Sequence, residues 1–537
     1  MKLLHGAVAG LIGFMAITAA RGQTAATTQS AVNDQPTTVH FVIDARKDVH
    51  PISRYIYGVN HTLDATYPHL TLTRLGGNRW TCYNWTNNAS NAGNDWHFQN
   101  DGYLGHDDVP GSATAAAIDS ASNAQAVIIL TIPMIGYVSA DKNGDGDVRN
   151  SGADYLTTRF RRSEPVKGAP FTLTPDPQSP VVYQDEFVNW VKAKYPYCLT
   201  DPLRPIFFSL DNEPAIWAET HAEAHPSPLT YEELVERSVA YANAIKDVLP
   251  ETKIFGPADY GWHGFVTLQD APDAAKNGDF LNYYLKRMKL AESIYGRRLL
   301  DALDVHWYPE ARAGNVRIIA PDATPEVAAV RLQAPRSLWD ATYVENSWIA
   351  RSIRGPIALI PRLLGKIHDN YPGTLLSLSE YNYGGGADIS GGIAQADALG
   401  IFGRYGVFAA CQWPLSRHEP FVAAAFAMYR NFDGKGAAFG DTSISATTDD
   451  VVGTSVYASV DSKDPNRVVI VAINKTDHLI SANVTMWYPA KYRQGQVFQL
   501  TAAAVTPKEG FLTLMLHPGR FGIPMPPMSV STVEFKS

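Results

Sequence analysis

The chain has 537 residues, of which 45% are hydrophobic and 18% are charged, and its formal net charge is -8. The charges form neither a basic stripe nor a run of one sign, which excludes a nucleic-acid-binding protein. Three cysteines allow at most one disulfide and lack metal-site spacing, so the chain depends on a large hydrophobic core and is no disulfide-stapled scaffold.

The N-terminal segment is typical of a secretory signal peptide over residues 1–22. Lys2 precedes an apolar stretch over residues 3–20, and small residues stand at the two positions that a signal peptidase reads. The apolar core is short for a membrane span, although an uncleaved anchor stays the alternative. We therefore expect a secreted or periplasmic protein. No later stretch is long and apolar enough to cross a bilayer, so we expect no membrane partner.

Residues 23–37 are rich in Thr, Ala, Gln and Ser and show no periodicity, which predicts a flexible leader. The next segment, residues 38–53, opens with a β-rich run at residues 38–44. This run lies outside the count of the barrel strands that follow. We expect it to pair into the C-terminal β-sandwich.

Between residues 54 and 425, eight β-rich runs alternate with segments that can hold a helix. Several runs are apolar at consecutive positions, as in parallel strands covered on both faces. The pattern predicts the α/β class and a (β/α)8 TIM barrel, whose active-site residues follow the C-terminal strand ends. A doubly wound sheet is the alternative, but no Gly-rich phosphate loop follows the first run. The runs are residues 55–60, 71–76, 126–133, 206–210, 253–257, 303–307, 375–379 and 407–412.

Residues 426–537 differ from the barrel region, because their short runs are β-branched or alternating and are separated by turn residues. This pattern predicts a second, smaller all-β sandwich domain of antiparallel strands. With the run at residues 38–44, the sandwich would be formed from both chain termini. No internal repeat and no appended carbohydrate-binding module is visible. The runs are residues 454–460, 467–473, 482–487, 497–501 and 529–535.

Two glutamates stand where apolar strands of the predicted barrel end. Glu213 follows the fourth run within Asp-Asn-Glu-Pro, and Glu380 follows the seventh run. Glycosidic cleavage needs such a pair, since one protonated carboxyl donates to the leaving oxygen and one carboxylate attacks C1. Asn212, directly before Glu213, could hydrogen-bond the sugar 2-hydroxyl. We therefore predict a retaining β-glycoside hydrolase, with Glu213 as the acid/base and Glu380 as the nucleophile.

Longer motifs are spread over nearly the whole predicted barrel, among them Arg-Leu-Gly-Gly-Asn, Asp-Asn-Glu-Pro and Asp-Val-His-Trp-Tyr-Pro. The stretches lie at residues 74–78, 83–85, 95–96, 130–136, 211–214, 304–309, 338–345, 347–348, 379–385 and 394–400. In them the chain resembles glycoside hydrolase family 44. The resemblance implies an endo-acting, retaining β-1,4-glucanase or xyloglucanase with a β-sandwich built from both termini. It also implies the same roles for Glu213 and Glu380.

Further side chains at the strand ends are candidates for binding substrate or for orienting the glutamates. Arg74 ends the second run, where its guanidinium could hold the Glu380 carboxylate ionised. A structural ion pair is the alternative for Arg74. Tyr308 ends the sixth run, and its phenol could hydrogen-bond Glu380. We interpret His306, two residues earlier, as a satisfied histidine of the barrel interior, with a catalytic role as the alternative.

Four tryptophans are candidates for sugar binding, because an indole face matches the apolar face of a sugar ring. Trp413 ends the eighth run, and Trp85, Trp96 and Trp348 fall in loops on the mouth side. The family resemblance implies Trp85, Trp348 and Trp413 as sugar platforms. Core packing is the alternative reading of a tryptophan.

A loop after the third run has the spacing of a calcium site. Asp141, Asn143, Asp145 and Asp147 place oxygen ligands at alternate positions, with a glycine at the turn. The twelfth position, Gly152, lacks the usual bidentate glutamate, so a solvated turn and a structural calcium both stay open. Catalysis itself requires no cofactor, because the glycosidase reaction uses two carboxyl groups alone.

The expected partner is a polysaccharide substrate, namely xyloglucan or another soluble β-1,4-glucan, and we expect the protein to act as a monomer. Xylan, mannan or a mixed-linkage glucan is the alternative substrate. A catalytically silent polysaccharide-binding protein is another alternative, but it would have no use for an intact glutamate pair. A metal-dependent hydrolase would need a convergent His/Asp cluster, and none is visible in the sequence.

Overall fold

A computed structural model of the protein describes residues 36–536 apart from 62, 64–68, 489–491 and 516. The predicted signal peptide, and the predicted leader up to residue 35, lie outside the described residues. Residues 37–537 form one compact unit. Within the described residues, no helix has both the length and the apolar character needed to span a bilayer.

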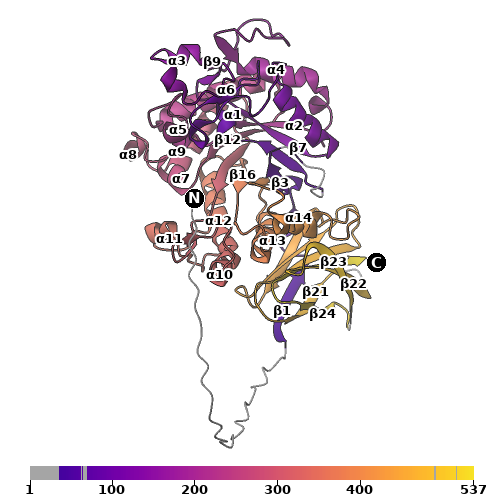
Figure 1. Ribbon diagram of the computed structural model, residues 1–537. Coiled ribbons are helices and arrows are strands. Elements are labelled where there is room, and N and C mark those ends of the chain that lie inside the picture. Colours follow the sequence, from indigo (N-terminus) through magenta and orange to yellow (C-terminus); the bar gives the residue numbers. More distant parts are fainter. Residues whose placement is uncertain (1–35, 62, 64–68, 489–491, 516, 537) are drawn as a thin grey trace, which may run out of the picture. The chain divides into compact units, whose positions relative to one another are not determined.

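Eight parallel strands close into a barrel in the order β11-β12-β13-β16-β17-β3-β4-β7, so the predicted (β/α)8 barrel is confirmed (Figure 1). Each strand overlaps one of the eight predicted runs. The strands are β3 (Gly58–Asn60), β4 (Leu72–Leu75), β7 (Val127–Ile132), β11 (Ile206–Leu210), β12 (Ile254–Asp259), β13 (Ala302–Trp307), β16 (Leu375–Tyr381) and β17 (Ala409–Gln412).

Among the longer helices, α2 contacts β7, α6 contacts β11 and β12, and α12 contacts β16, whereas α13 and α14 contact strands of the C-terminal sheet. The longer helices are α2 (Ser112–Asn123), α4 (Gln184–Lys194), α6 (Tyr231–Val248), α9 (Phe280–Tyr295), α12 (Leu359–Asn370), α13 (Ile389–Arg404) and α14 (Pro420–Arg430). Shorter helices are α1 (Asn78–Thr81), α3 (Tyr155–Thr158), α5 (Trp217–Thr220), α7 (Trp262–Thr267), α8 (Ala274–Asn277), α10 (Pro325–Gln333) and α11 (Trp348–Ile353).

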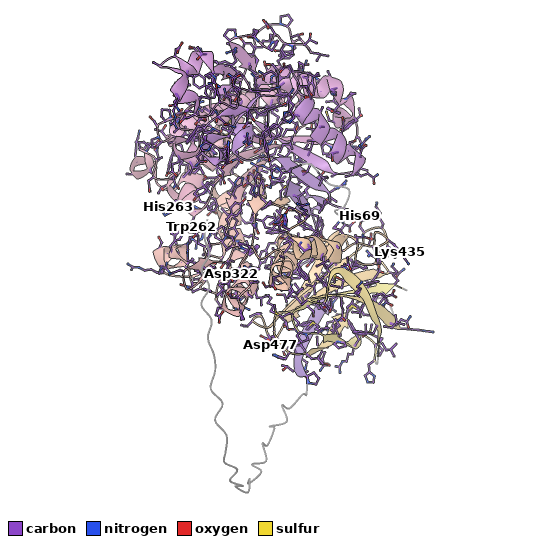
Figure 2. All side chains as sticks on the ribbon, in the orientation of Figure 1. His69, Trp262, His263, Asp322, Lys435 and Asp477 are labelled. Carbon is purple, nitrogen blue, oxygen red and sulfur yellow. The ribbon has the colours of Figure 1, made fainter. Side chains whose placement is uncertain are left out.

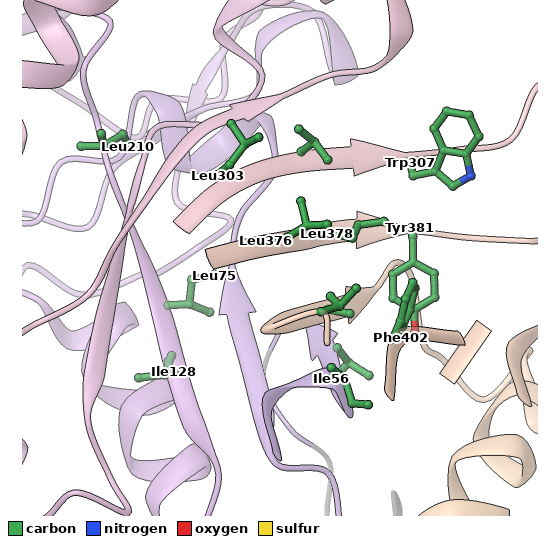
Figure 3. Close-up of a cluster of buried hydrophobic side chains, with 14 of the residues drawn as sticks. Ile56, Leu75, Ile128, Leu210, Leu303, Trp307, Leu376, Leu378, Tyr381 and Phe402 are labelled. Atoms are coloured by element: carbon green, nitrogen blue, oxygen red, sulfur yellow. The ribbon is translucent and has the colours of Figure 1, made fainter. Parts of the chain in front are cut away.

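The barrel strands bury side chains on both faces. Inside the barrel, Leu72, Val127 and Ala302 belong to one apolar cluster. The alternate residues pack outward on the helices, and Figure 3 shows Leu303 and Leu376 in that outer cluster. Since side chains alternate along a strand, the inward positions of β4 and β13 continue from this apolar floor to polar residues at the C-terminal end. That end of the barrel carries the site.

The β-sandwich has the strand order β23-β22-β25-β20-β19-β18-β1-β21-β24, with β2 (His50–Pro51) beside β18, around one apolar core. β1 (Thr37–Asp44) pairs with β18 and β21, so a domain built from both termini is confirmed (Figure 1). The other strands are β18 (Thr442–Thr448), β19 (Thr454–Val460), β20 (Arg467–Asn474), β21 (Ile480–Trp487), β22 (Gln494–Thr501), β23 (Ala504–Leu514), β24 (Arg520–Met525) and β25 (Ser529–Lys536).

The structure corrects the sequence analysis of this domain in three respects. The sandwich is not wholly antiparallel, because β1 runs parallel to β21. Three strands, β18, β23 and β24, have no predicted counterpart. The predicted boundary after residue 425 falls inside α14, which continues to Arg430 because its apolar face stays buried.

Small sheets and hairpins build the loops above the barrel. β8 (Tyr137–Ser139), β9 (Phe160–Glu164) and β10 (Val181–Tyr183) form a three-stranded sheet that follows β7 in the chain. β5 (Ser90–Asn91) pairs with β6 (Asn100–Asp101), and β14 (Arg312–Ala313) pairs with β15 (Val316–Arg317). The three cysteines, Cys82, Cys198 and Cys411, are free.

Candidate active site

Glu213 is presented by a sharp turn at the end of β11. Its backbone is left-handed, with φ 46° and ψ 52°, and its N–H donates to the Ala258 carbonyl at 2.9 Å. Asp211, also at positive φ, accepts from the N–H groups of Asn212 at 2.8 Å and Ile135 at 3.2 Å. A non-glycine residue in this region costs conformational energy and persists where the surroundings fix it. Here the fixed turn directs Glu213 into the barrel mouth.

Glu380 lies within β16, and His306 on the neighbouring strand β13 stands between the two glutamates. His306 Nδ1 lies 2.7 Å from Glu213 Oε1 and 3.5 Å from Glu380 Oε2. One carboxylate oxygen of each glutamate and this nitrogen all lie within 4.8 Å of one another. Retaining glycosidases hold their carboxyl groups about 5–5.5 Å apart, whereas inverting enzymes need about 6.5–9.5 Å for a water. The spacing is therefore that of a retaining pair.

Both carboxylate oxygens of Glu380 accept a hydrogen bond from a neighbouring side chain. Arg74, which is fully buried, donates from Nη1 to Glu380 Oε1 at 2.7 Å. The Tyr308 hydroxyl donates to the other oxygen, Oε2, at 2.8 Å. A charge-assisted bond from guanidinium together with a phenolic donor stabilises the anion and fixes its orientation. These are the contacts that the sequence analysis expected of Arg74 and Tyr308, and they suit a nucleophile.

Glu213 has the opposite environment. Its side chain is 15% exposed and accepts no hydrogen bond from an arginine among the described residues. Burial raises its pKa to about 8, an effect that the Arg74 charge opposes and the Asp95 charge adds to. Burial also lowers the pKa of His306 to about 4, so the ring is neutral. Glu213 therefore carries a proton at neutral pH, which is the state that a general acid needs.

His306 corrects the sequence analysis, which interpreted it as a satisfied histidine. Its Nε2 has no hydrogen-bond partner among the described residues, and its Nδ1 faces both glutamates. The same trio is a convergent His/carboxylate cluster, which the sequence did not reveal. It does not fit a divalent metal, because the Arg74 guanidinium already neutralises Glu380 and would repel a second cation.

Asn212 lies beside the pair as expected. Its Oδ1 accepts from Arg74 Nη2 at 2.9 Å and from the Gly77 N–H at 3.0 Å. This fixes the orientation of the amide. Among the described residues its Nδ2 group has no acceptor, which leaves it free to donate to a sugar hydroxyl.

Two cavities flank the glutamates. The first, about 590 Å³, is lined by Trp413, Trp96, Trp80, Gly77 and Asp95, among others. Trp80 is a lining residue that was not predicted, because it lies outside the quoted motifs and does not end a strand. Trp96 is 56% exposed and lies at this cavity as an accessible ring.

The second cavity, about 270 Å³, lies on the other side of the pair. It is lined by Tyr308, Tyr260, Trp348, Trp262 and His263, and Figure 2 labels the last two. The His263 ring packs edge-on against Trp348, with 4.5 Å between the ring centroids. Each cavity adjoins the site through one lining residue, since Tyr308 of the second contacts Glu380 and Gly77 of the first contacts Asn212.

Trp85 lines neither cavity, contrary to the expectation. It is 1% exposed, stacks on Phe187 with 5.6 Å between centroids and donates from Nε1 to the Tyr183 carbonyl. A ring buried in this way cannot offer a face to a sugar. Trp85 is a core residue that fixes the loop below the mouth.

The predicted calcium loop is occupied by arginines. Arg159 donates to Asp141 at 2.7 and 3.0 Å and to Asp145 at 2.7 Å. Asp147 pairs with Arg149 and caps the turn that follows. The guanidinium groups take the oxygens that a calcium ion would need. The residues present, Asn143 included, therefore do not fit a bound calcium, and the loop is an arginine-braced turn.

Comparisons with known proteins cover both the barrel and the sandwich. A family model described as glycoside hydrolase family 44 matches residues 89–311. The chain is 40% identical over 524 residues to endoglucanase A of Paenibacillus lautus, covering 95% of this chain and 74% of that protein. Cel44A, a family 44 endoglucanase from Clostridium thermocellum, aligns with a TM-score of 0.88 at 40% identity. A Paenibacillus polymyxa xyloglucanase of family 44, solved with xyloglucan, aligns at 0.89 and 39%. Both structural alignments cover 93% of this chain and 100% of the other.

Proposed function

The chain belongs to glycoside hydrolase family 44, and from that premise we propose that it cleaves internal β-1,4-glucosidic bonds of xyloglucan and other soluble β-1,4-glucans with retention of configuration. Glu213 is the acid/base and Glu380 is the nucleophile. One observation carries the proposal: one oxygen of each carboxyl group lies within 4.8 Å of the other, beside residues that line two aromatic cavities.

In the first step, Glu380 attacks C1 while the bond to the leaving oxygen breaks. The proton of Glu213 goes to that oxygen, and a covalent glycosyl-enzyme forms. Until then Arg74 and Tyr308 hold the Glu380 carboxylate in place through one hydrogen bond to each oxygen. As Glu380 becomes an ester its charge disappears, so the contacts with Arg74 and Tyr308 weaken at the moment the bond forms.

In the second step, Glu213 is a carboxylate and takes a proton from water. That water attacks C1, the ester bond to Glu380 breaks, and the sugar leaves with its original configuration. His306 Nδ1 beside Glu213 gives the carboxyl a hydrogen-bond partner in both protonation states, since a neutral ring can accept at one nitrogen or donate from it.

The two cavities support an extended glycan as substrate, because aromatic rings line both of them next to the cleavage point. The relatives named as an endoglucanase and a xyloglucanase support a β-1,4-glucan backbone. Because one relative is named as a xyloglucanase and was solved with xyloglucan, we expect the enzyme to prefer soluble or hydrated glycans. Equal sugar release from crystalline cellulose and xyloglucan would contradict that preference.

The test is reducing-sugar release from xyloglucan and carboxymethyl cellulose by the wild type, Glu213→Ala and Glu380→Ala, with folding verified by circular dichroism. We expect cleavage by the wild type and losses of several orders of magnitude in both variants. Near-wild-type activity in either variant would overturn the site assignment. A wild type that binds the polymers without cleaving them would favour the silent binding protein. Inertness without binding would lead to xylan, mannan and mixed-linkage glucan as the next substrates.

The reaction as proposed needs no metal, so activity should survive a chelator at unchanged fold. Loss of activity with retained fold would favour the metal-dependent alternative. We further propose that the protein is secreted or periplasmic, which the apolar stretch at residues 3–20 supports. We also propose that it acts as a monomer. Size-exclusion chromatography with light scattering tests the monomer, and N-terminal sequencing of the exported protein tests cleavage after residue 22.

A further inference from the structure

A buried histidine next to the catalytic turn takes no part in the two steps above. His221 directly follows α5 and is 1% exposed. Its Nδ1 lies 2.8 Å from Glu223 Oε1, and its Nε2 lies 2.8 Å from the backbone oxygen of Asn78. The ring thus joins the loop after β11, which carries Glu213, to the start of α1.

The two hydrogen bonds of His221 require an additional proton. A carbonyl and an ionised carboxylate only accept, whereas a neutral imidazole donates from one nitrogen only. The pair therefore holds a proton between Nδ1 and Oε1 besides the one on Nε2. Burial lowers the pKa of His221, but Cys82 and Glu223 raise it well above 6.5. The described titratable and charged groups around the pair are Cys82, Asp211, Arg149 and Tyr155.

The contacts favour this proton-bridged pair over a metal site, although Cys82, His221 and Glu223 could each offer a ligand atom. Two ligands of a tetrahedral zinc, at 2.0–2.1 Å from the ion, lie about 3.3 Å apart. The 2.8 Å between Nδ1 and Oε1 is a direct hydrogen bond instead. Nε2 is bonded to the Asn78 carbonyl, so neither nitrogen is free.

The bond to Asn78 reaches the substrate side of the site. Gly77, the preceding residue, donates its N–H to Asn212 Oδ1 at 3.0 Å. It has a φ of +95°, and a Cβ there would lie 2.6 Å from the Trp413 ring. The turn at residues 77–78 therefore positions both the Asn212 amide beside Glu213 and the Trp413 ring that packs on Gly77. His221 anchors that turn from below.

We propose that His221 is a positioning residue for the sugar-binding side of the site, acting through Asn78 and Gly77 on Asn212 and Trp413. The role rests on the function proposed above. Without the ring, the turn loses its anchor and the two substrate-binding groups shift together. Misplacement by about 1 Å costs on the order of 10²-fold in rate. Glu223 serves the same role by holding the ring with both nitrogens bonded.

The test uses His221→Ala, Glu223→Ala and Glu223→Gln, assayed for kcat and KM on soluble xyloglucan. In Glu223→Gln the amide donates to Nδ1 while the ring still donates to Asn78, so the chain of bonds survives without the extra proton. We expect both alanine variants to lose about tenfold or more in kcat/KM, in kcat through Asn212 and in KM through Trp413. Glu223→Gln should stay within about threefold of the wild type.

His225→Ala is the matched control, because that ring also pairs with a carboxylate, Glu233 at 3.1 Å on α6. Circular dichroism and urea unfolding establish that the assayed protein is folded. A folded His221→Ala with wild-type kcat and KM overturns the positioning role and leaves the proposed function intact. Equal losses in Glu223→Gln and Glu223→Ala overturn it too. A wild type inert on xyloglucan and carboxymethyl cellulose overturns the proposed function itself.

Discussion

Arg74 and Glu380 at the barrel mouth, and Lys475 and Asp397 between the sandwich and α13, are both buried ion pairs with an N–O distance of 2.7 Å. The side chains of the first pair are 0% and 7% exposed, and those of the second are 1% and 2% exposed. Burial and pairing are thus nearly the same in the two places. The difference lies in what surrounds each carboxylate.

Asp397 is saturated, because Lys475 binds one oxygen and the Tyr457 hydroxyl donates to the other at 2.6 Å. Glu380 also accepts two hydrogen bonds, but an oxygen of Glu213, whose pKa is raised, lies within 4.8 Å of one of its oxygens. Residues that contact Glu380 and Asn212 line two cavities beside the pair. Two neighbouring carboxyl groups, one protonated and one ionised, can act together as acid and nucleophile. An isolated ion pair such as Lys475 and Asp397 cannot. Burial alone therefore does not distinguish a catalytic carboxylate from a structural one.

The largest expected effect separates the two carboxylates by activity. Glu380→Ala should lower kcat/KM on xyloglucan by about 10⁴-fold or more, because the attacking group is gone. Asp397→Asn should leave kcat/KM of the folded enzyme within about threefold, because Asp397 is remote from the cavities. Steady-state kinetics at 25 °C on protein shown to be folded provide the measurement. A comparable loss in Asp397→Asn would break the distinction.

The second effect separates the pairs by stability. Lys475→Met leaves Asp397 buried without its cation, which should lower the free energy of unfolding by about 3–5 kcal/mol. Replacing both partners, as Lys475→Met with Asp397→Leu, should recover most of that loss, since no unpaired charge remains. Urea unfolding followed by circular dichroism measures both variants. If the single variant unfolds like the wild type, the pair is not a stabilising contact.

The third effect is the pH dependence of kcat/KM, which reflects the protonation of the general acid Glu213. Burial raises the pKa of Glu213 to about 8, so the general acid is protonated below that pH and kcat/KM should fall as the pH rises above about 8. Asp95→Asn should move this fall to lower pH, because the Asp95 charge contributes to the raised pKa of Glu213. Asp477→Asn, at a fully exposed carboxylate of the sandwich, is the control. An unchanged profile in Asp95→Asn would contradict the coupling.

Much of the fold was predictable because local pattern and tertiary role coincide. Several barrel strands are apolar at consecutive positions, and Glu213 and Glu380 lie at the C-terminal ends of two β-rich runs. β23 and β24 were missed for the opposite reason. They are the terminal strands of the sheet order, and charged residues, Pro and Gly in them interrupt any apolar alternation. The boundary was placed inside α14 because the apolar residues of this helix could belong to the core of either the barrel or the sandwich.

In the site, the sequence predicted residues whose role follows from a strand end and failed where the role depends on a distant partner. Arg74 and Tyr308 contact Glu380 as expected. His306 was undervalued because its two carboxylates come from other strands. The spacing at residues 141–147 left a calcium site and a solvated turn open, because Arg159, whose guanidinium binds Asp141, lies 18 residues further along the chain. Trp85 and Trp96 look alike in sequence, and only packing separates a core ring from an open one.

The smallest expected effect distinguishes two tryptophan rings of nearly equal exposure, one beside the site and one on the sandwich. Trp96 at the first cavity is 56% exposed, and Trp487 on β21 of the sandwich is 55% exposed. Losing one sugar–aromatic contact is worth about 0.5–1.5 kcal/mol, so Trp96→Ala should raise KM for xyloglucan by about two- to tenfold with kcat nearly unchanged. Trp487→Ala should leave both constants unchanged, because its ring lies on the sandwich surface. Equal KM values in Trp96→Ala and the wild type would remove Trp96 from the substrate-binding site, and a raised KM in Trp487→Ala would instead extend substrate binding to the sandwich.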